Sequence, residues 1–215
     1  MSSSHFLRLA TIAGSGKFLA AARHNKRALQ NERGSAGHID PALSHLNYPL
    51  LELATPEEVY QRAKMMMHTA GLAKLRKNGV AAIEIIFSLP AHSQIEHHTY
   101  FVDCTDWAAT QFGRENLLSS DVHLDEAAPH CHVLVLPLRG GRMQGSDVMG
   151  DRQAMLKRQA SFYEAVSSRH GLTKPLVKQR VGNAQQQLLD AAVMAHLMQT
   201  SDVCQKSVLW PLARD

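Results

Sequence analysis

The run from His123 to His132 constrains this chain more than any other feature. It holds three histidines and two carboxylates within ten residues, and an apolar segment at 133–136 follows directly. His130 and His132 alternate, so on a β-strand both rings would lie on one face. Pro129 and the small and acidic residues before it favour a turn, which would bring His123 beside the pair. Three neutral imidazoles on neighbouring strands predict a metal site with open coordination positions.

The same run has plainer interpretations. The chain contains 13 histidines, so two at alternate positions can arise by chance. Cys131 lies between two proposed ligands but should face the other side of its strand, which favours a core residue over a thiolate ligand. Asp125 and Glu126 could orient or deprotonate a neighbouring group, or they could only shape the turn. The acidic turn between the histidines is what favours the metal hypothesis over chance.

Length and composition limit the remaining possibilities. With 215 residues, 45% of them hydrophobic, the chain can bury the core of one domain, with or without a helical appendix. We find no apolar run that approaches the ~20 residues of a membrane span. The start, Met1 to His5, lacks the basic and hydrophobic segments of a secretory signal. Three scattered cysteines argue against a disulfide framework, so we expect a reducing, cytoplasmic setting.

Positive charge is concentrated on both sides of the histidine-rich centre. Residues 17–33 carry five Lys or Arg against one acidic residue, and residues 139–180 carry nine against three. The stretch between them is acidic overall. Clustered cations indicate a polyanion partner. The alternative is a set of solvated helix faces.

Periodicity and boundary residues predict strands at 6–12, 80–89, 117–123 and 130–138, with a short strand after Gly140-Gly141. Helices are expected at 17–27, 56–77, from Asp103 or Thr105 to 112, 151–169 and 185–198, with a long ordered loop at 31–49. A short connection joins 117–123 to 130–138, so these two strands should pair antiparallel. The fold class is α+β: a central antiparallel sheet of about five strands flanked by helices.

A second group of chemically active residues is Arg23-His24-Asn25-Lys26-Arg27. Neighbouring cations disfavour protonation of a histidine, and a neutral ring nitrogen is a nucleophile. The same cations could hold a phosphate. The alternative is a basic surface helix that happens to contain one histidine.

A third group, Ser44-His45-Leu46-Asn47-Tyr48, makes Tyr48 a rival nucleophile, or else an aromatic side chain packed at the edge of the core. The segment 13–17 superficially resembles a phosphate loop. A Walker-type loop, however, needs Gly and Ser or Thr where Thr11 and Phe18 stand. We therefore expect no nucleotide binding.

These groups occur in a fixed order: His24–Arg27, His38-Ile39-Asp40, Ser44–Tyr48, and the run from His123 to His132. Together they resemble the sequential motifs of the Mob/Pre, or MobV, plasmid mobilisation relaxases, which are HUH endonucleases. The resemblance covers roughly residues 5–171, and the histidine run is its most specific part. It implies a relaxase (nicking and strand-transfer) domain at 1–180 and a C-terminal helical extension at 181–215.

The resemblance implies an enzyme that nicks one DNA strand at a plasmid transfer origin, stays joined to the 5′ end and later reseals it. His123, His130 and His132 would hold Mn²⁺ or Mg²⁺, and His24 would be the nucleophile. Glu126 would activate or orient His24, and Arg27 would steady the phosphate or the nucleophile. Single-stranded or hairpin DNA would be the partner, with accessory mobilisation proteins possible. The residues expected to contact the DNA are Arg23, Lys26, Asn47, Tyr48, Arg139 and Arg142.

Two other function classes stay open at this point. A replication initiator or transposase on the same scaffold would use a tyrosine, so an adduct on Tyr48 rather than His24 would favour it. A non-catalytic DNA-binding module would give neither a nick nor a covalent adduct.

Overall fold

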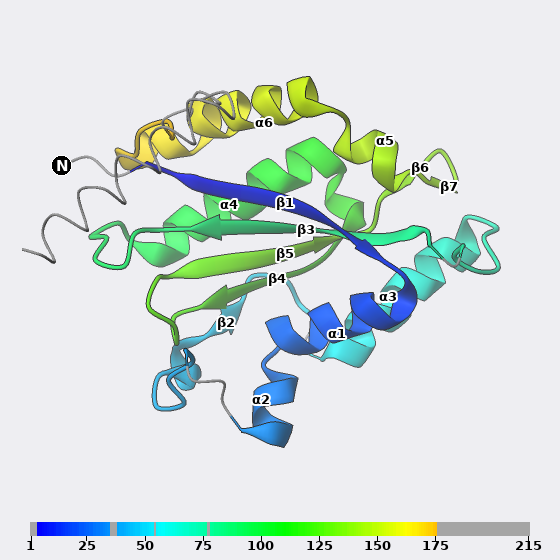
Figure 1. Ribbon diagram of the computed structural model, residues 1–215, viewed down its shortest axis with the longest axis horizontal. Coiled ribbons are helices and arrows are strands. Elements are labelled where there is room, and N and C mark those ends of the chain that lie inside the picture. Colours follow the sequence, from blue (N-terminus) through cyan, green and yellow to red (C-terminus); the bar gives the residue numbers. More distant parts are fainter. Residues whose placement is uncertain (1–3, 35–37, 54, 77, 176–215) are drawn as a thin grey trace, which may run out of the picture. The chain divides into compact units, whose positions relative to one another are not determined.

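The computed structural model describes residues 4–34, 38–53, 55–76 and 78–175. Its centre is a five-stranded sheet in the order β1-β3-β5-β4-β2, in which every neighbouring pair is antiparallel. This confirms the α+β class with a central antiparallel sheet (Figure 1). The strands are β1 (Phe6–Ala13), β2 (Tyr48–Pro49), β3 (Val80–Ser88), β4 (Leu117–His123) and β5 (His130–Val135), and a separate hairpin pairs β6 (Leu138–Arg139) with β7 (Arg142–Met143).

One face of the sheet, here the reverse face, is covered by α4 (His97–Phe112) and α6 (Arg152–Ala165) (Figure 1). The larger hydrophobic core lies between them and the sheet. Phe87 of β3 meets Phe162 of α6 with ring centroids 5.2 Å apart, and Trp107 of α4 packs against the same ring. Side chains that alternate along a strand point to opposite faces. The reverse face therefore takes Leu7, Leu9, Ile83, Ile85, Phe87, Val122, Cys131, Val133 and Val135.

The opposite face, here the front face, is covered only in part. A second core cluster forms where α1 (Ser15–Asn25) and α3 (Pro56–Thr69) pack on Ala82 and Leu134. At the other end of β3, β4 and β5 the front face carries polar side chains, and these build the site described below. Shorter helices complete the described fold: α2 (Ala28–Arg33), α5 (Gly145–Met149), and the 3₁₀ helices η1 (Ser44–Leu46), η2 (Arg114–Asn116) and η3 (Ser167–His170).

Several predicted element boundaries were wrong. The helix predicted at 56–77 ends at Thr69, because Gly71 adopts φ +76° and closes a Schellman motif: the Leu72 N–H donates to the Met67 carbonyl and the Gly71 N–H to that of His68. Helix α4 begins at His97, six residues before Asp103, because the Glu96 carboxylate caps it by accepting from the N–H groups of His98 and Thr99.

Three further expectations need correction. The helix predicted at 17–27 is α1, which ends at Asn25, and a second helix that was not predicted, α2, follows it after Arg27, which takes a left-handed conformation (φ 55°). The loop expected at 31–49 contains the end of α2, η1 and β2. The helix expected at 151–169 stops at Ala165 and continues as η3. The helix predicted at 185–198 and the C-terminal extension lie outside the described residues.

Among the helices that the structure describes, we find none with the length and apolar character needed to cross a bilayer.

Candidate metal centre

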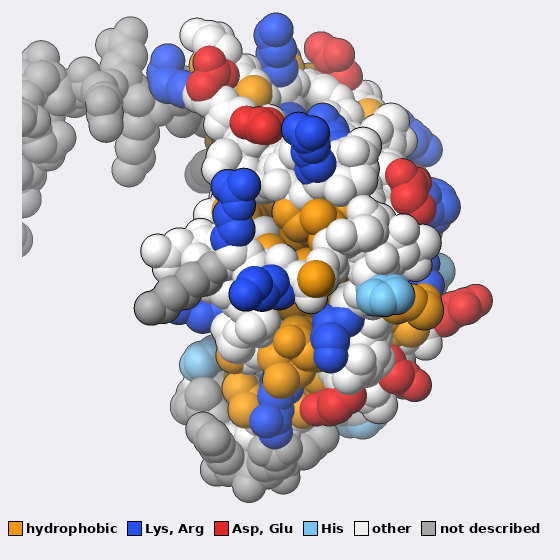
Figure 2. Space-filling model, turned by 90° about the vertical axis from the view of Figure 1, so that its right-hand side faces the viewer, with side chains coloured by type: hydrophobic (Ala, Val, Ile, Leu, Met, Phe, Trp, Pro, Cys, Tyr) orange, Lys and Arg blue, Asp and Glu red, His pale blue; other side chains and the backbone are white. Residues whose placement is uncertain are grey.

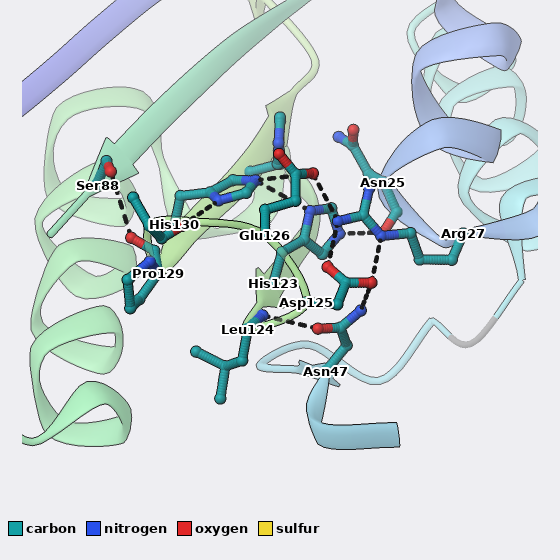
Figure 3. Close-up of polar contacts among 12 residues, drawn as sticks. Asn25, Arg27, Asn47, Ser88, His123, Leu124, Asp125, Glu126, Pro129 and His130 are labelled. Atoms are coloured by element: carbon teal, nitrogen blue, oxygen red, sulfur yellow. Dashed lines mark hydrogen bonds and ion pairs between the residues drawn. The ribbon is translucent and has the colours of Figure 1, made fainter. Parts of the chain in front are cut away.

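The three histidines of the central run meet on the front face of the sheet. His123 ends β4, His130 opens β5, and the register pairs them directly. The centroids of the three rings lie 5.0 Å from one another. One nitrogen from each ring falls within 4.8 Å of the others (Figure 3). The antiparallel pairing that the turn predicted therefore brings three imidazoles to one point.

The remaining nitrogen of each ring is hydrogen-bonded to an oxygen. Nε2 of His123 lies 2.7 Å from the Asn25 carbonyl, and Nδ1 of His130 lies 2.9 Å from the Ala128 carbonyl. Nδ1 of His132 lies 3.0 Å from the Glu84 carboxylate. Carbonyl and carboxylate oxygens accept, so each of these nitrogens carries the proton. The lone pairs left for a metal are on Nε2 of His132 and on Nδ1 of His123 and Nε2 of His130, and these last two nitrogens lie 3.2 Å apart.

Burial keeps the rings of His123 and His130 in the neutral form that a metal needs. It lowers the pKa of His123 to about 2, with further lowering by His132 and Arg27. Burial also lowers the pKa of His130. In each ring one nitrogen has a lone pair directed at the centre of the cluster, and the other, here called the outer nitrogen, is hydrogen-bonded to an oxygen. Neutral imidazoles arranged in this way are typical ligands of a first-row divalent cation. The residues present therefore fit such an ion, and three ligands leave coordination positions for other groups.

Two residues that sequence reasoning missed support this arrangement. Glu84 of β3 holds His132 and also accepts from the Asn25 side-chain amide at 3.4 Å. Burial would raise the pKa of Glu84, but the hydrogen bond and charge of His132 outweigh it and lower that pKa. Asn25 is buried and touches both Glu84 and His123. Glu84 had a sequence signal, since it is the one charged residue in the apolar run 80–89.

His24 lies near the end of α1, beside the rings of His123 and His132. Its ring centroid is 5.7 Å from that of His132 and 6.4 Å from that of His123, with near-perpendicular planes. Burial lowers the pKa of His24, and His132 and Arg27 lower it further, whereas Glu126 and Glu84 raise it. His24 is therefore a neutral imidazole near neutral pH, adjacent to the cluster and partly open to solvent.

Arg27 joins the turn between β4 and β5 to the junction of α1 and α2. Its Nε donates to Asp125 at 3.0 Å, and its Nη2 donates to both Asp125 and Glu126, at 2.5 and 2.8 Å (Figure 3). The Glu126 carboxylate also lies 3.7 Å from Nε2 of His130. The guanidinium thus fixes Glu126 beside the cluster. Its Nη1 is buried and has no hydrogen-bond partner among the described residues, so both roles expected for Arg27, at the phosphate or at the nucleophile, stay predictions.

Asp125 and Asn47 form the buried base of this network. Asp125 is fully buried and accepts from Arg27, from the Ser44 hydroxyl at 2.9 Å and from the Asn47 amide at 2.7 Å. Burial would raise the pKa of Asp125, but these hydrogen bonds outweigh it and lower the pKa to about 2. The Asn47 carbonyl oxygen accepts from the Leu124 N–H at 2.7 Å. Both ends of the Asn47 amide are used inside the protein, which does not fit the expected DNA contact.

Two more residues expected at the DNA have partners within the protein. The Lys26 ammonium points inward, 2.7 Å from the Asp121 carboxylate, and its side chain is 6% exposed. Tyr48 pairs with Val122, whose side chain belongs to the reverse face. Directly opposite residues on paired strands share a face, so the Tyr48 ring packs on the core of the reverse face, stacked on His98. Arg23 lies half-buried on α1.

Arg139 and Arg142 lie on the β6–β7 hairpin, at the end of the sheet away from His130. Both are exposed. Arg142 lines a groove of about 790 Å³ together with Lys74 and Arg76. Figure 2 looks toward this end of the sheet and shows Lys and Arg side chains around apolar surface. These two arginines are therefore separate from the histidine cluster.

Known proteins resemble this chain in sequence. The family model Mob_Pre, described as "Plasmid recombination enzyme", matches residues 1–179. A plasmid recombination enzyme of Bacillus sp is 32% identical over 66% of this chain and 35% of its own length. The type 1 enzyme of Staphylococcus aureus is 27% identical over 78% of this chain and 43% of its own. The chain thus spans less than half the length of these relatives.

Solved structures of the MobM relaxase domain share the fold. One, bound to plasmid pMV158 oriT DNA and Mn at pH 5.5, superposes with a TM-score of 0.71 and 23% identity, covering 87% of this chain and all of that one. Another, with a 3′-thiophosphate DNA at pH 6.8, gives a TM-score of 0.72 and 24% identity over 87% of this chain and 99% of that one.

Proposed function

The chain belongs to the Mob_Pre family of plasmid recombination enzymes, and on that premise we propose that it is a relaxase. It would nick one strand of DNA at a plasmid transfer origin, remain joined to the 5′ phosphate, and reseal the strand afterwards. The observation that supports this most is the position of His24, a neutral imidazole whose ring lies 5.7 Å from that of His132 in the three-histidine cluster.

The cluster would hold one divalent cation, Mn²⁺ or Mg²⁺, through His123, His130 and His132. Such an ion, when bound, would neutralise charge on the non-bridging oxygens of the scissile phosphate. The solved MobM domains were bound to Mn, and here the convergence of three free ring nitrogens carries the same proposal.

His24 would attack the phosphorus through an unprotonated ring nitrogen. A phosphorus–nitrogen bond forms, the bond to the 3′ oxygen breaks, and that oxygen takes a proton from solvent water and leaves as a hydroxyl. The covalent link conserves the energy of the broken ester, so resealing by the reverse reaction needs no nucleotide. The ring gains positive charge during attack, and the Glu126 carboxylate, held by Arg27, would stabilise that charge.

The partner would be single-stranded or hairpin DNA, and the MobM domains were solved bound to pMV158 oriT DNA of 22 or 26 nucleotides. Arg139 and Arg142 lie away from the histidine cluster, so they would contact a flanking part of the DNA rather than the scissile phosphate. Activity on plasmid DNA implies a cytoplasmic location in a bacterium and accessory mobilisation proteins as further partners.

A nicking assay on a supercoiled plasmid carrying the transfer origin, with Mn²⁺ present, tests the proposal. We expect relaxed product and a denaturant-resistant protein–DNA adduct. The adduct should be acid-labile and map to His24, because a phosphoramidate hydrolyses in acid whereas a phosphotyrosine does not. His24→Ala should abolish the adduct while binding of origin DNA stays within about two-fold of wild type.

Other results would favour the other function classes. An acid-stable adduct on Tyr48 would indicate an initiator-type or transposase-type enzyme. DNA binding with neither nick nor adduct would leave a non-catalytic binding module. Equal loss of binding and nicking in His24→Ala would reduce His24 to a contact residue.

A further inference from the structure

An exposed aromatic side chain stands in register with the metal centre. Phe6 of β1 is 48% exposed. It pairs with Ser88 of β3, and Ser88 in turn pairs with His130. Directly opposite residues share a face of the sheet, so the Phe6 ring lies on the front face, on the same side as the three histidines. Two strand spacings put its Cα about 10 Å from that of His130.

Two residues further along β1, Arg8 is aligned across β3 with another histidine of the cluster. Arg8 pairs with Ile86, and Ile86 pairs with His132. Arg8 is exposed. Ser88 and Ile86, the β3 residues in the middle of the two rows, are half-buried. Leu7 and Leu9, which alternate with Phe6 and Arg8, are buried on the reverse face. Burial is thus complete on one side of β1, while an aromatic ring and a guanidinium stay open on the other.

This strip adjoins the site on the side that the helices leave open. Helices α1 and α3 cover the front face around Ala82 and Leu134, at the other end of β3 and β5. His24 reaches the cluster from the end of α1. A DNA strand whose phosphate lies between His24 and the histidines can therefore extend over β3 and β1 (Figure 1).

We propose that Phe6, Arg8 and the half-buried Ile86 and Ser88 form a docking surface for single-stranded DNA beside the scissile phosphate. The Phe6 ring stacks on a base, and Arg8 binds a backbone phosphate. An aromatic ring next to a cation on an open sheet face is the combination with which proteins bind unpaired nucleotides. This inference rests on the proposed function and deepens it, because it identifies where the substrate strand leaves the site.

The first test measures base stacking without metal. The probes are a fluorescent oligothymidylate and an abasic oligomer of equal length, titrated in the presence of a chelator. Phe6→Ala should weaken binding of the oligothymidylate by about 5- to 20-fold and leave binding of the abasic oligomer unchanged. Phe6→Trp should restore binding, and its added fluorescence should be quenched by the oligothymidylate alone. Leu156→Ala, on α6 and 39% exposed, is the matched control and should bind as wild type.

The second test measures the phosphate contact through salt dependence. Arg8→Gln should reduce the slope of log K against log salt by about 0.7, the value for one phosphate on a single strand. Arg152→Gln, an exposed arginine of α6 on the other side of the sheet, should leave the slope unchanged. Circular dichroism melts of every variant should match wild type, since each substituted side chain is exposed.

The outcomes separate this inference from the proposed function. If wild type binds the oligothymidylate and Phe6→Ala binds equally well, the docking surface is wrong while the relaxase proposal stands. If Phe6→Ala loses equal affinity for both oligomers, the ring does not stack on a base, and the inference is again overturned. If wild type binds no single-stranded DNA, both proposals fall.

Discussion

At the scale of single residues, the outer nitrogens of the three histidines decide what the cluster can do. Two of them are fixed by backbone carbonyls, which mutation cannot remove, but His132 depends on the Glu84 side chain. A carboxylate on the outer nitrogen of a metal-binding histidine fixes the ring and strengthens its free lone pair. Glu84 is therefore the accessible point at which to test the support of the site.

We expect Glu84→Ala to weaken Mn²⁺ binding by about 10- to 100-fold, the range for loss of such a partner. Glu84→Gln should lose less, because its amide oxygen can still accept from Nδ1. Isothermal titration with Mn²⁺ measures the effect, and Glu164→Ala, an exposed change on α6, serves as control. Unchanged Mn²⁺ affinity in Glu84→Ala would mean that the carboxylate only fills space.

At the scale of elements, Arg27 shows why α1 stops at Asn25 and a second helix starts at Ala28. A left-handed conformation costs a residue with a Cβ about 1–2 kcal/mol. Here the turn of the chain aims the guanidinium at Asp125, 98 positions away. Nothing local in the basic run at 23–27 signals that partner. Boundaries set by local chemistry, such as Gly71 after α3, had a sequence signal, whereas this break depends on a tertiary ion pair.

Asp125→Asn should therefore destabilise the fold by about 3 kcal/mol, because it leaves a buried guanidinium without its main charge partner. For a chain of this size we expect the Tm to fall by roughly 6–12 °C. Asp106→Asn removes an exposed partner of Arg114, in a pair whose side chains are 66% and 55% exposed. It should cost less than ~1 kcal/mol. Similar changes of Tm in the two variants would contradict the stabilising role of the Arg27–Asp125 ion pair.

At the scale of the whole molecule, short-range pattern in the sequence predicted the histidine cluster and four of the sheet's five strands, but not β2, which lies in the segment expected as a loop. Alternating histidines, an acidic turn and two apolar strands determine the β4–β5 register almost alone. The orientations of Tyr48 and Lys26 depend on contacts with β4, which is distant in sequence: Tyr48 pairs with Val122, and Lys26 pairs with Asp121. Both residues lie in motifs rich in functional residues, so the sequence predicted DNA contacts for them. In the structure, the Tyr48 ring packs on the core of the reverse face and the Lys26 ammonium pairs with Asp121.

The two faces of the sheet therefore separate the rival nucleophiles. The Tyr48 ring packs on the reverse core, and burial, with the nearby Cys131 and Glu96, raises its pKa to about 12. Its hydroxyl is buried and has no hydrogen-bond partner among the described residues. Tyr48→Phe removes a polar group that gains nothing from burial, so the Tm should stay constant or rise. Nicking and adduct formation should persist at wild-type level, whereas His24→Ala abolishes both. An adduct lost in Tyr48→Phe, at unchanged Tm, would place the chemistry on the tyrosine and overturn the assignment to His24.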